Sequence, residues 1–243
     1  MSGSTKAMQT TGAGRNQIGE LLLRLRGEAL LRLAPGCRIV DLGHGEPDIA
    51  LWLDEVCESI DIIKRSQLFS GDKIAVDLPS ASYDLTYCIR TLPHLGKDKK
   101  SSDRAVRAML EEVARLTVPG GTAVVEVDNP HSLRGGALGI RQTFRGFTRG
   151  RIVIEHEGRS VDRFDALSNV IDMLPPTLKL MSIQGLRVLL PTSHLATLPL
   201  VGKVLCRLEW WAREHPLLRR FGAHLLLVLH RVRDVDVPQL RRS

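Results

Sequence analysis

The sequence is poor in aromatic residues, with five Phe, three Trp and two Tyr among 243 residues. Proteins that hold single-stranded nucleic acid commonly stack its bases on aromatic side chains. The formal charge of +7 would suit a phosphate backbone. The small number of stacking platforms nevertheless argues against a nucleic-acid partner.

The sequence also lacks the cysteine and histidine spacing of a metal site. Its four cysteines are Cys37, Cys57, Cys88 and Cys206; none belongs to a Cys-x-x-Cys pair, and no histidine stands beside them at zinc-ligand spacing. We therefore expect no metal, and free thiols in a reducing compartment.

Long apolar runs are absent as well. The first 15 residues are polar, without the apolar core of a signal peptide, and the apolar stretch at 223–230 is too short to span a bilayer. We expect a cytoplasmic protein with no membrane partner, in which residues 1–16 form a flexible tail.

The charge that is present is unevenly distributed. Residues 36–90 carry ten acids and five bases, whereas residues 131–154 carry five arginines and no acid. The positive excess therefore lies in a central stretch and at the two ends, and the first third of the expected core is acidic.

Hydrophobic periodicity predicts an alternation of helices and short strands. Such alternation is typical of a parallel sheet covered by helices on both faces, so we expect an α/β fold and a single domain over residues 17–243. The expected helices are 17–33, 47–56 and 101–116, and the expected strands are 37–42, 59–63, 73–77, 83–89, 122–127, 182–190 and 223–232.

A glycine-rich turn follows the first expected strand, in the sequence Val40-Asp41-Leu42-Gly43-His44-Gly45. Glycines allow a backbone to approach a ligand closely. Asp61 stands twenty residues after Asp41, at the end of the second expected strand, where a carboxylate can accept both hydroxyls of a ribose. The alternative is a tight strand–helix turn without a ligand.

Further motifs follow this turn in a fixed order. Asp77-Leu78-Pro79 precedes Tyr83-Asp84-Leu85, then come Leu92-Pro93-His94-Leu95 and Val118-Pro119-Gly120-Gly121. This succession resembles the class I S-adenosylmethionine-dependent methyltransferases that act on small molecules. The resemblance implies a doubly wound, Rossmann-like sheet of seven strands whose last strand is antiparallel, with S-adenosylmethionine as cofactor. It also implies a small-molecule acceptor that we expect to be methylated at oxygen, with nitrogen or carbon as the alternatives.

The resemblance also implies roles for individual residues. Asp41, Gly43, His44 and Gly45 would line the amino-acid end of the cofactor, and Asp61 would bind its ribose. Asp72 or Asp77 would lie near the adenine. The segment from Cys88 to Arg90, just past the fourth strand, would pass beneath the sulfonium.

Two features depart from the family pattern. Glu46 and Pro47 stand where the family has a small residue and a third glycine, and only ten residues separate Asp61 from Asp72. Glu46 would repel the cofactor's carboxylate. These features favour a second hypothesis, a catalytically silent methyltransferase-like subunit that stabilises or activates a partner methyltransferase. An RNA methyltransferase or RNA-binding module is a third, supported only by charge.

Candidate catalytic and substrate-binding residues lie at the expected sheet edge. His94 and His131 could each deprotonate an acceptor hydroxyl, and a structural histidine is the alternative for His94. Arg134, Arg141 and Arg145 fall where the family inserts a substrate lid, here residues 131–176, and could bind an anionic acceptor; a solvated basic loop is the alternative. Glu126 and Asp128 should face the same side of their strand. Trp210 and Trp211 could supply an apolar interface to a second methyltransferase-like subunit, and packing against the protein's own sheet is the alternative. A homodimer is also an open possibility.

Overall fold

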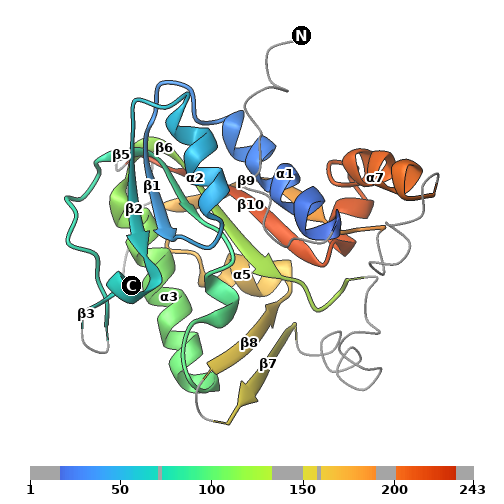
Figure 1. Ribbon diagram of the computed structural model, residues 1–243. Helices are drawn as coiled ribbons and strands as arrows, with labels where there is room; N and C mark the ends of the chain where they lie inside the picture. Colours follow the sequence, from blue (N-terminus) through green and yellow to red (C-terminus); the bar gives the residue numbers. More distant parts are fainter. Residues whose placement is uncertain (1–16, 71–72, 133–149, 158–159, 190–200, 234–243) are drawn as a thin grey trace.

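The computed structural model describes residues 17–70, 73–132, 150–157, 160–189 and 201–233, whose helices and strands form a sheet with helices on both faces (Figure 1). The helices are α1 (Gln17–Leu31), α2 (Pro47–Asp54), α3 (Lys99–Leu116), α5 (Leu167–Met173) and α7 (Val201–Ala212), with 3-10 turns η1 (Arg65–Gln67), η2 (Leu92–His94) and η4 (Leu218–Phe221). The strands are β1 (Arg38–Gly43), β2 (Ser59–Lys64), β3 (Phe69–Ser70), β4 (Lys73–Ile74), β5 (Tyr83–Cys88), β6 (Thr117–Asp128), β7 (Arg151–His156), β8 (Ser160–Asp165), β9 (Leu178–Leu186) and β10 (His224–Arg231).

The main sheet has the order β2-β1-β5-β6-β10-β9. The first four strands are mutually parallel, and β10 runs antiparallel to both β6 and β9. The doubly wound sheet with an antiparallel last strand is therefore confirmed. Eight strands rather than seven belong to it, because the hairpin of β7 and β8 joins at the end of β6 through Asp128 and Phe164.

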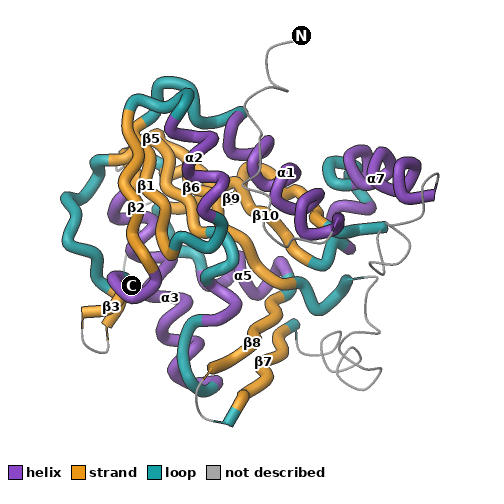
Figure 2. The backbone as a smooth tube through the Cα atoms, viewed as in Figure 1, coloured by secondary structure: helices purple, strands orange, loops and turns teal. Residues whose placement is uncertain are grey.

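Helices lie on both faces of the sheet (Figure 2), and an apolar core lies between the helices and the sheet on each face. On one face, α3 contributes Val106, Met109, Leu110 and Val113, which pack with α5 against residues such as Val125 and Leu227. On the other face, Leu23 and Leu30 of α1 and Trp52 of α2 cover Ile39 and Leu85. The helical spacing of these apolar residues explains why each helix lies against the sheet.

The expected strand at 73–77 does not join the main sheet. Only Lys73 and Ile74 are extended, and they pair with β3 in a separate two-stranded ribbon. Beyond them, the α3 side chains take the hydrogen bonds that a neighbouring strand would have taken: Glu112 accepts from the Val76 amide, and Arg115 donates to the carbonyls of Val76 and Leu78. Among the described residues between β2 and this ribbon, only the short 3-10 turn η1 is helical.

The hairpin of β7 and β8 occupies the region predicted as a lid insertion. Arg163 of β8 is buried and donates to Asp103 of α3 over 2.7 Å, and Arg151 of β7 donates to the same carboxylate over 2.6 Å. Glu155 accepts from the Lys99 amide at the start of α3. The described part of the insertion is thus fixed to α3.

Among the described residues, none of the helices combines the length and the apolar character that crossing a membrane requires.

Candidate active site

The strand order places a switch point between β1 and β5, where the chain turns to opposite sides of the sheet. In open α/β sheets, ligands bind in the crevice outside the carboxyl ends of the strands at such a point. The segments that line it here are Gly43–Glu46 after β1 and Ile89–Thr91 after β5. The site predicted from sequence around the glycine turn lies at this place.

The two glycines allow these segments to pack against each other. Gly43 has a φ of +108°, and a Cβ there would lie 2.1 Å from Oγ1 of Thr91. A Cβ on Gly45 would lie 2.4 Å from the Ile89 carbonyl oxygen. Each glycine is therefore required by the chain itself, and the space that its missing side chain leaves is filled by the segment after β5.

Two of the five non-glycine residues with a positive φ among the described residues lie at this place. His44 and Arg90 have φ values of 49° and 55°. Residues held in the left-handed region cluster at functional sites, where surrounding contacts fix them. One of the two lies on each side of the crevice, in agreement with its place at the switch point of the sheet.

Asp41 forms hydrogen bonds with the turn that follows β1. Its carboxylate is buried, accepts a hydrogen bond from the His44 amide over 3.2 Å and lies 3.1 Å from Nδ1 of His44. Burial raises the pKa of Asp41 above its ordinary value, and the hydrogen bonds from His44 oppose this effect. Asp41 therefore fixes the shape of the turn, and its contact with the amino-acid end of the cofactor stays a prediction.

Glu46 belongs to a buried ion-pair network. Arg26 of α1 donates to both oxygens of Glu126 on β6, over 2.8 and 2.5 Å, and to Glu46 over 3.2 Å. Arg90 donates to the same Glu46 oxygen over 3.0 Å and is half exposed. Burial alone would lower the pKa of Arg26, but Glu126 and Glu46 raise it above its ordinary value. Two arginines therefore compensate the charge of Glu46, which reduces the repulsion expected between Glu46 and the cofactor's carboxylate.

Asp61 does not lie at the end of its strand. It is the third of the six residues of β2 and pairs with Val40, whereas Lys64, the last residue, pairs with Gly43. The Tyr83 hydroxyl, from the first residue of β5, donates to Asp61 over 2.6 Å. A base, not an acid, therefore stands beside the glycine turn, and the sequence placement of Asp61 was wrong.

Asp77, one of the two residues expected near the adenine, is also displaced. Asp77 lies between Val76 and Leu78, which form hydrogen bonds with side chains of the last two turns of α3. Because α3 leads directly into the start of β6, Asp77 is near the amino ends of the strands. Asp72 lies outside the described residues. Cys88 is the last residue of β5 and is fully buried in the core, where burial raises the pKa of its thiol. Arg90 is the residue of this segment that faces solvent.

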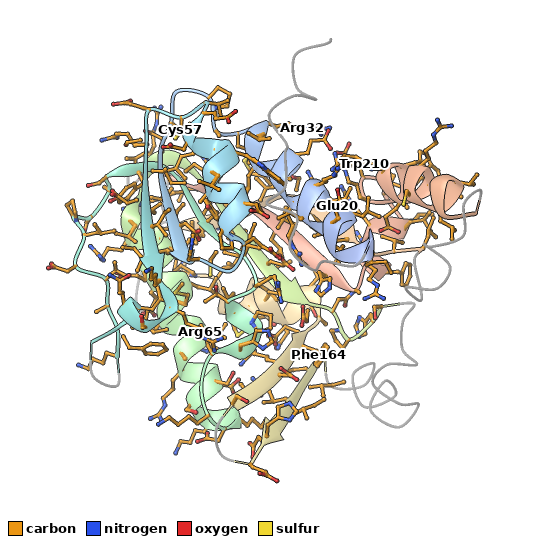
Figure 3. The ribbon with its side chains drawn as sticks, in the orientation of Figure 1. Glu20, Arg32, Cys57, Arg65, Phe164 and Trp210 are labelled. Atoms are coloured by element: carbon orange, nitrogen blue, oxygen red, sulfur yellow. The ribbon has the colours of Figure 1, made fainter. Side chains whose placement is uncertain are left out.

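His94 has a carboxylate partner that the sequence did not indicate. Its Nδ1 lies 3.1 Å from Asp162 of β8, and Nε2 of His156 lies 2.8 Å from the other oxygen of the same carboxylate. Arg65, just after β2, donates to the His94 carbonyl and is labelled near the centre of Figure 3. The histidine therefore lies between the end of β2 and the β7–β8 hairpin.

His131 follows β6, and its amide donates to the side chain of Asn129. The neighbouring residues Glu126 and Asp128 do face the same side, because both lie close to His224 at the start of β10. Their ligand atoms lie within 4.8 Å of one another, close enough for a metal ion. Arg26 already covers both oxygens of Glu126, so this cluster is an ion-pair network.

The predicted substrate residues Arg134, Arg141 and Arg145 lie outside the described residues. The sequence analysis did not identify Arg26 as a functional residue, because it lies within the long amphipathic pattern of the first predicted helix. It shares a face with Leu22, Ala29 and Leu30, and a charge on an apolar face of a helix was the available signal. Lys64 would have been found by extending the second strand by one residue.

Comparison with known proteins agrees with this architecture. No protein-family model and no curated protein matches the sequence. An S-adenosylmethionine-dependent methyltransferase from Mesorhizobium loti superposes with a TM-score of 0.50 at 18% identity, over 86% of this chain and 98% of that one. A protein from Listeria monocytogenes assigned to the same class gives 0.53 at 12% identity, over 87% and 97%. The chain therefore has the fold of the S-adenosylmethionine-dependent methyltransferases.

Proposed function

We propose that this protein binds S-adenosylmethionine in the crevice between β1 and β5 and supports transfer of its methyl group to a small molecule. The observation that carries the proposal is the pair of left-handed residues, His44 and Arg90, which lie on the two segments that line the switch point of a methyltransferase fold. When bound, S-adenosylmethionine supplies an electrophilic methyl group on a positively charged sulfur.

The residues at the amino-acid end fit such a cofactor. The turn from Gly43 to Gly45 presents backbone groups in a shape that Asp41 fixes. Arg90 is half exposed and can pair with a carboxylate, because its other partner, Glu46, is also neutralised by Arg26. The carboxylate of Asp41 beneath the turn suits a cation.

The ribose end fits less well. Lys64 takes the place beside Gly43 where a carboxylate would accept the two ribose hydroxyls, and an ammonium group only donates hydrogen bonds. We therefore expect the affinity for the cofactor to be low.

His94 is our proposed base for a hydroxyl acceptor. An ionised Asp162 accepts a hydrogen bond and so favours the proton on Nδ1 of His94, which leaves Nε2 to take a proton from the acceptor. The β7–β8 hairpin, which carries Asp162, forms one wall of the acceptor site in this proposal, and His131 is the second candidate base. O-methylation in small-molecule biosynthesis follows as the proposed reaction.

Calorimetry with the full chain tests cofactor binding. Titration with S-adenosylmethionine and with S-adenosylhomocysteine should give heat for both, and Asp41→Asn should weaken binding by roughly tenfold or more, because the turn loses a charged hydrogen-bond acceptor. Asp84→Asn is a matched control, since Asp84 bonds Arg38 at the amino end of the strands. Absence of heat from the unmodified chain would rule out a stand-alone enzyme.

A second candidate is a catalytically silent subunit that stabilises or activates a partner methyltransferase. The specific observation in its favour is that Thr91 and Ile89 fill the space beside both glycines, so the turn needs no ligand to explain it. This hypothesis expects no heat from either compound with the unmodified chain. It also expects Asp41→Asn to change the unfolding temperature alone.

A further inference from the structure

Helix α7 is fixed to the body of the protein by one of its faces. Leu205, Cys206 and Trp210 pack against the apolar cluster of α1, and Figure 3 shows Trp210 at the contact between the two helices. Arg213 lies over the Trp210 ring at 4.5 Å and pairs with Glu28 of α1 over 3.0 Å. The helix is therefore held firmly, and its outer face has a defined position.

That outer face is apolar and open to solvent. Val204, Leu208 and Trp211 are 56%, 42% and 56% exposed, and their spacing of four and three residues places them on one stripe of the helix. Leu217 and Phe221 are exposed within the next ten residues of the chain. Single exposed apolar residues are ordinary, but a continuous stripe that ends in a tryptophan marks an interaction surface.

The charges around the stripe are mainly positive. Between residues 204 and 221, Arg207 and Arg220 are exposed. The exposed acid of this segment, Glu214, already accepts from Arg32 and Arg213 over 2.9 and 3.0 Å. The second acid, Glu209, is buried and holds the amides of Val188 and Leu189. The outer face of α7 thus offers apolar side chains with the exposed Arg207 beside them, and a second exposed base, Arg220, follows in η4.

We propose that the outer face of α7 docks on an anionic lipid surface. Tryptophan and leucine on one side of a helix, with exposed Arg207 beside them and exposed Arg220 in the η4 turn that follows, fit a segment that lies in the membrane interface, with apolar side chains buried in lipid and bases near the headgroups. Pairing of two copies through this face is disfavoured, because a two-fold contact would bring the same exposed bases together. The proposal concerns a face of α7 that is not part of the crevice and does not depend on the proposed reaction. It departs from the expectation of no membrane partner, which rested on the absence of a long apolar run.

Co-sedimentation of the full chain with phosphatidylcholine vesicles containing about one third phosphatidylserine tests the proposal. We expect binding at low salt that weakens as salt is raised or as phosphatidylserine is omitted. Trp211→Glu should reduce the partition coefficient roughly tenfold or more, because it replaces an apolar side chain that would enter the bilayer by a charge that anionic lipid repels. Leu208→Glu should also reduce the partition coefficient. This second variant keeps the test valid if Trp211→Glu does not fold.

Leu51→Glu is the matched control. Leu51 is 58% exposed on α2, and the substitution makes the same change in charge at a site away from α7, so it should bind vesicles as the unmodified chain does. The proposal is wrong if anionic vesicles fail to bind the chain at low salt. It is equally wrong if Trp211→Glu and Leu208→Glu bind as well as Leu51→Glu. A dimer in light scattering that Trp211→Glu dissociates, without vesicle binding, would assign the face to a second copy and overturn the proposal.

Discussion

Arg26 donates to both carboxylate oxygens of Glu126, over 2.8 and 2.5 Å, although one hundred residues separate them in the sequence. Both side chains are almost completely buried. The pair joins the first helix to the centre of the sheet, and through Glu46 it reaches the candidate site.

Replacing Arg26 by Met should therefore destabilise the protein strongly. The substitution leaves Glu126 charged and buried without its cation, which typically costs about 3–5 kcal/mol. The free energy of unfolding in urea measures the effect. Arg24→Met is the matched control on the same helix: Arg24 pairs with Glu20 in solvent, so its loss should cost about 1 kcal/mol or less. Equal costs for the two variants would contradict a structural role for the buried pair.

Gly43→Ala should disrupt the site as well as the fold. The new Cβ would meet Thr91 at 2.1 Å and would require a left-handed backbone. Gly36→Ala separates these two effects, because Gly36 also has a positive φ, of +68°, but has nothing within 4 Å of its Cβ position. We expect the Gly36 variant to lose about 1 kcal/mol from backbone strain alone. The Gly43 variant should lose several times as much in urea unfolding, and similar losses would mean that Thr91 moves aside freely.

Local sequence patterns predicted the strands and helices of the sheet well, since periodicity and turn residues carry this information along the chain. Residues 73–77 were misassigned because the pairing partner of a strand is not local: Glu112 and Arg115, some forty residues later, take its hydrogen bonds. The partners of Arg26 and His94 were missed for the same reason. Asp61 was placed at the end of the second strand, whereas it is the third of the six residues of β2, and Lys64 rather than Asp61 lies beside Gly43.

Glu112→Gln should destabilise the protein in a pH-dependent manner. Burial alone would raise the pKa of Glu112, but hydrogen bonds from Arg115 and from the Val76 amide lower it below its ordinary value of 4.5. A carboxyl with a lowered pKa in the folded state contributes stability above its unfolded pKa and loses it as the pH falls through the folded pKa. We expect a loss of about 2 kcal/mol near neutral pH.

Urea unfolding near neutral pH and again well below 4.5 checks this dependence. The difference between Glu112→Gln and the unmodified chain should shrink on the acid side. Glu111→Gln is the control, because Glu111 is adjacent and exposed. A difference that stays constant with pH would show that the ionised form of Glu112 is not what stabilises the Val76–Leu78 segment.

Lys64→Asp should strengthen the binding of S-adenosylmethionine. The substitution puts a carboxylate beside Gly43, where it can accept hydrogen bonds from both ribose hydroxyls and attract the sulfonium. Hydrogen bonds to a charged group contribute about 1.5–3 kcal/mol each, so we expect at least a tenfold gain in calorimetry. Lys100→Asp makes the same change in net charge on the exposed start of α3 and should leave the affinity unchanged. Asp61→Asn should also leave it unchanged, because Asp61 is held by Tyr83.

A gain confined to Lys64→Asp means that the fold retains the rest of a cofactor site and that this one base limits its affinity. If instead neither Lys64→Asp nor the unmodified chain binds, the packing of Thr91 and Ile89 against the glycine turn closes the crevice, and the silent subunit becomes the better hypothesis.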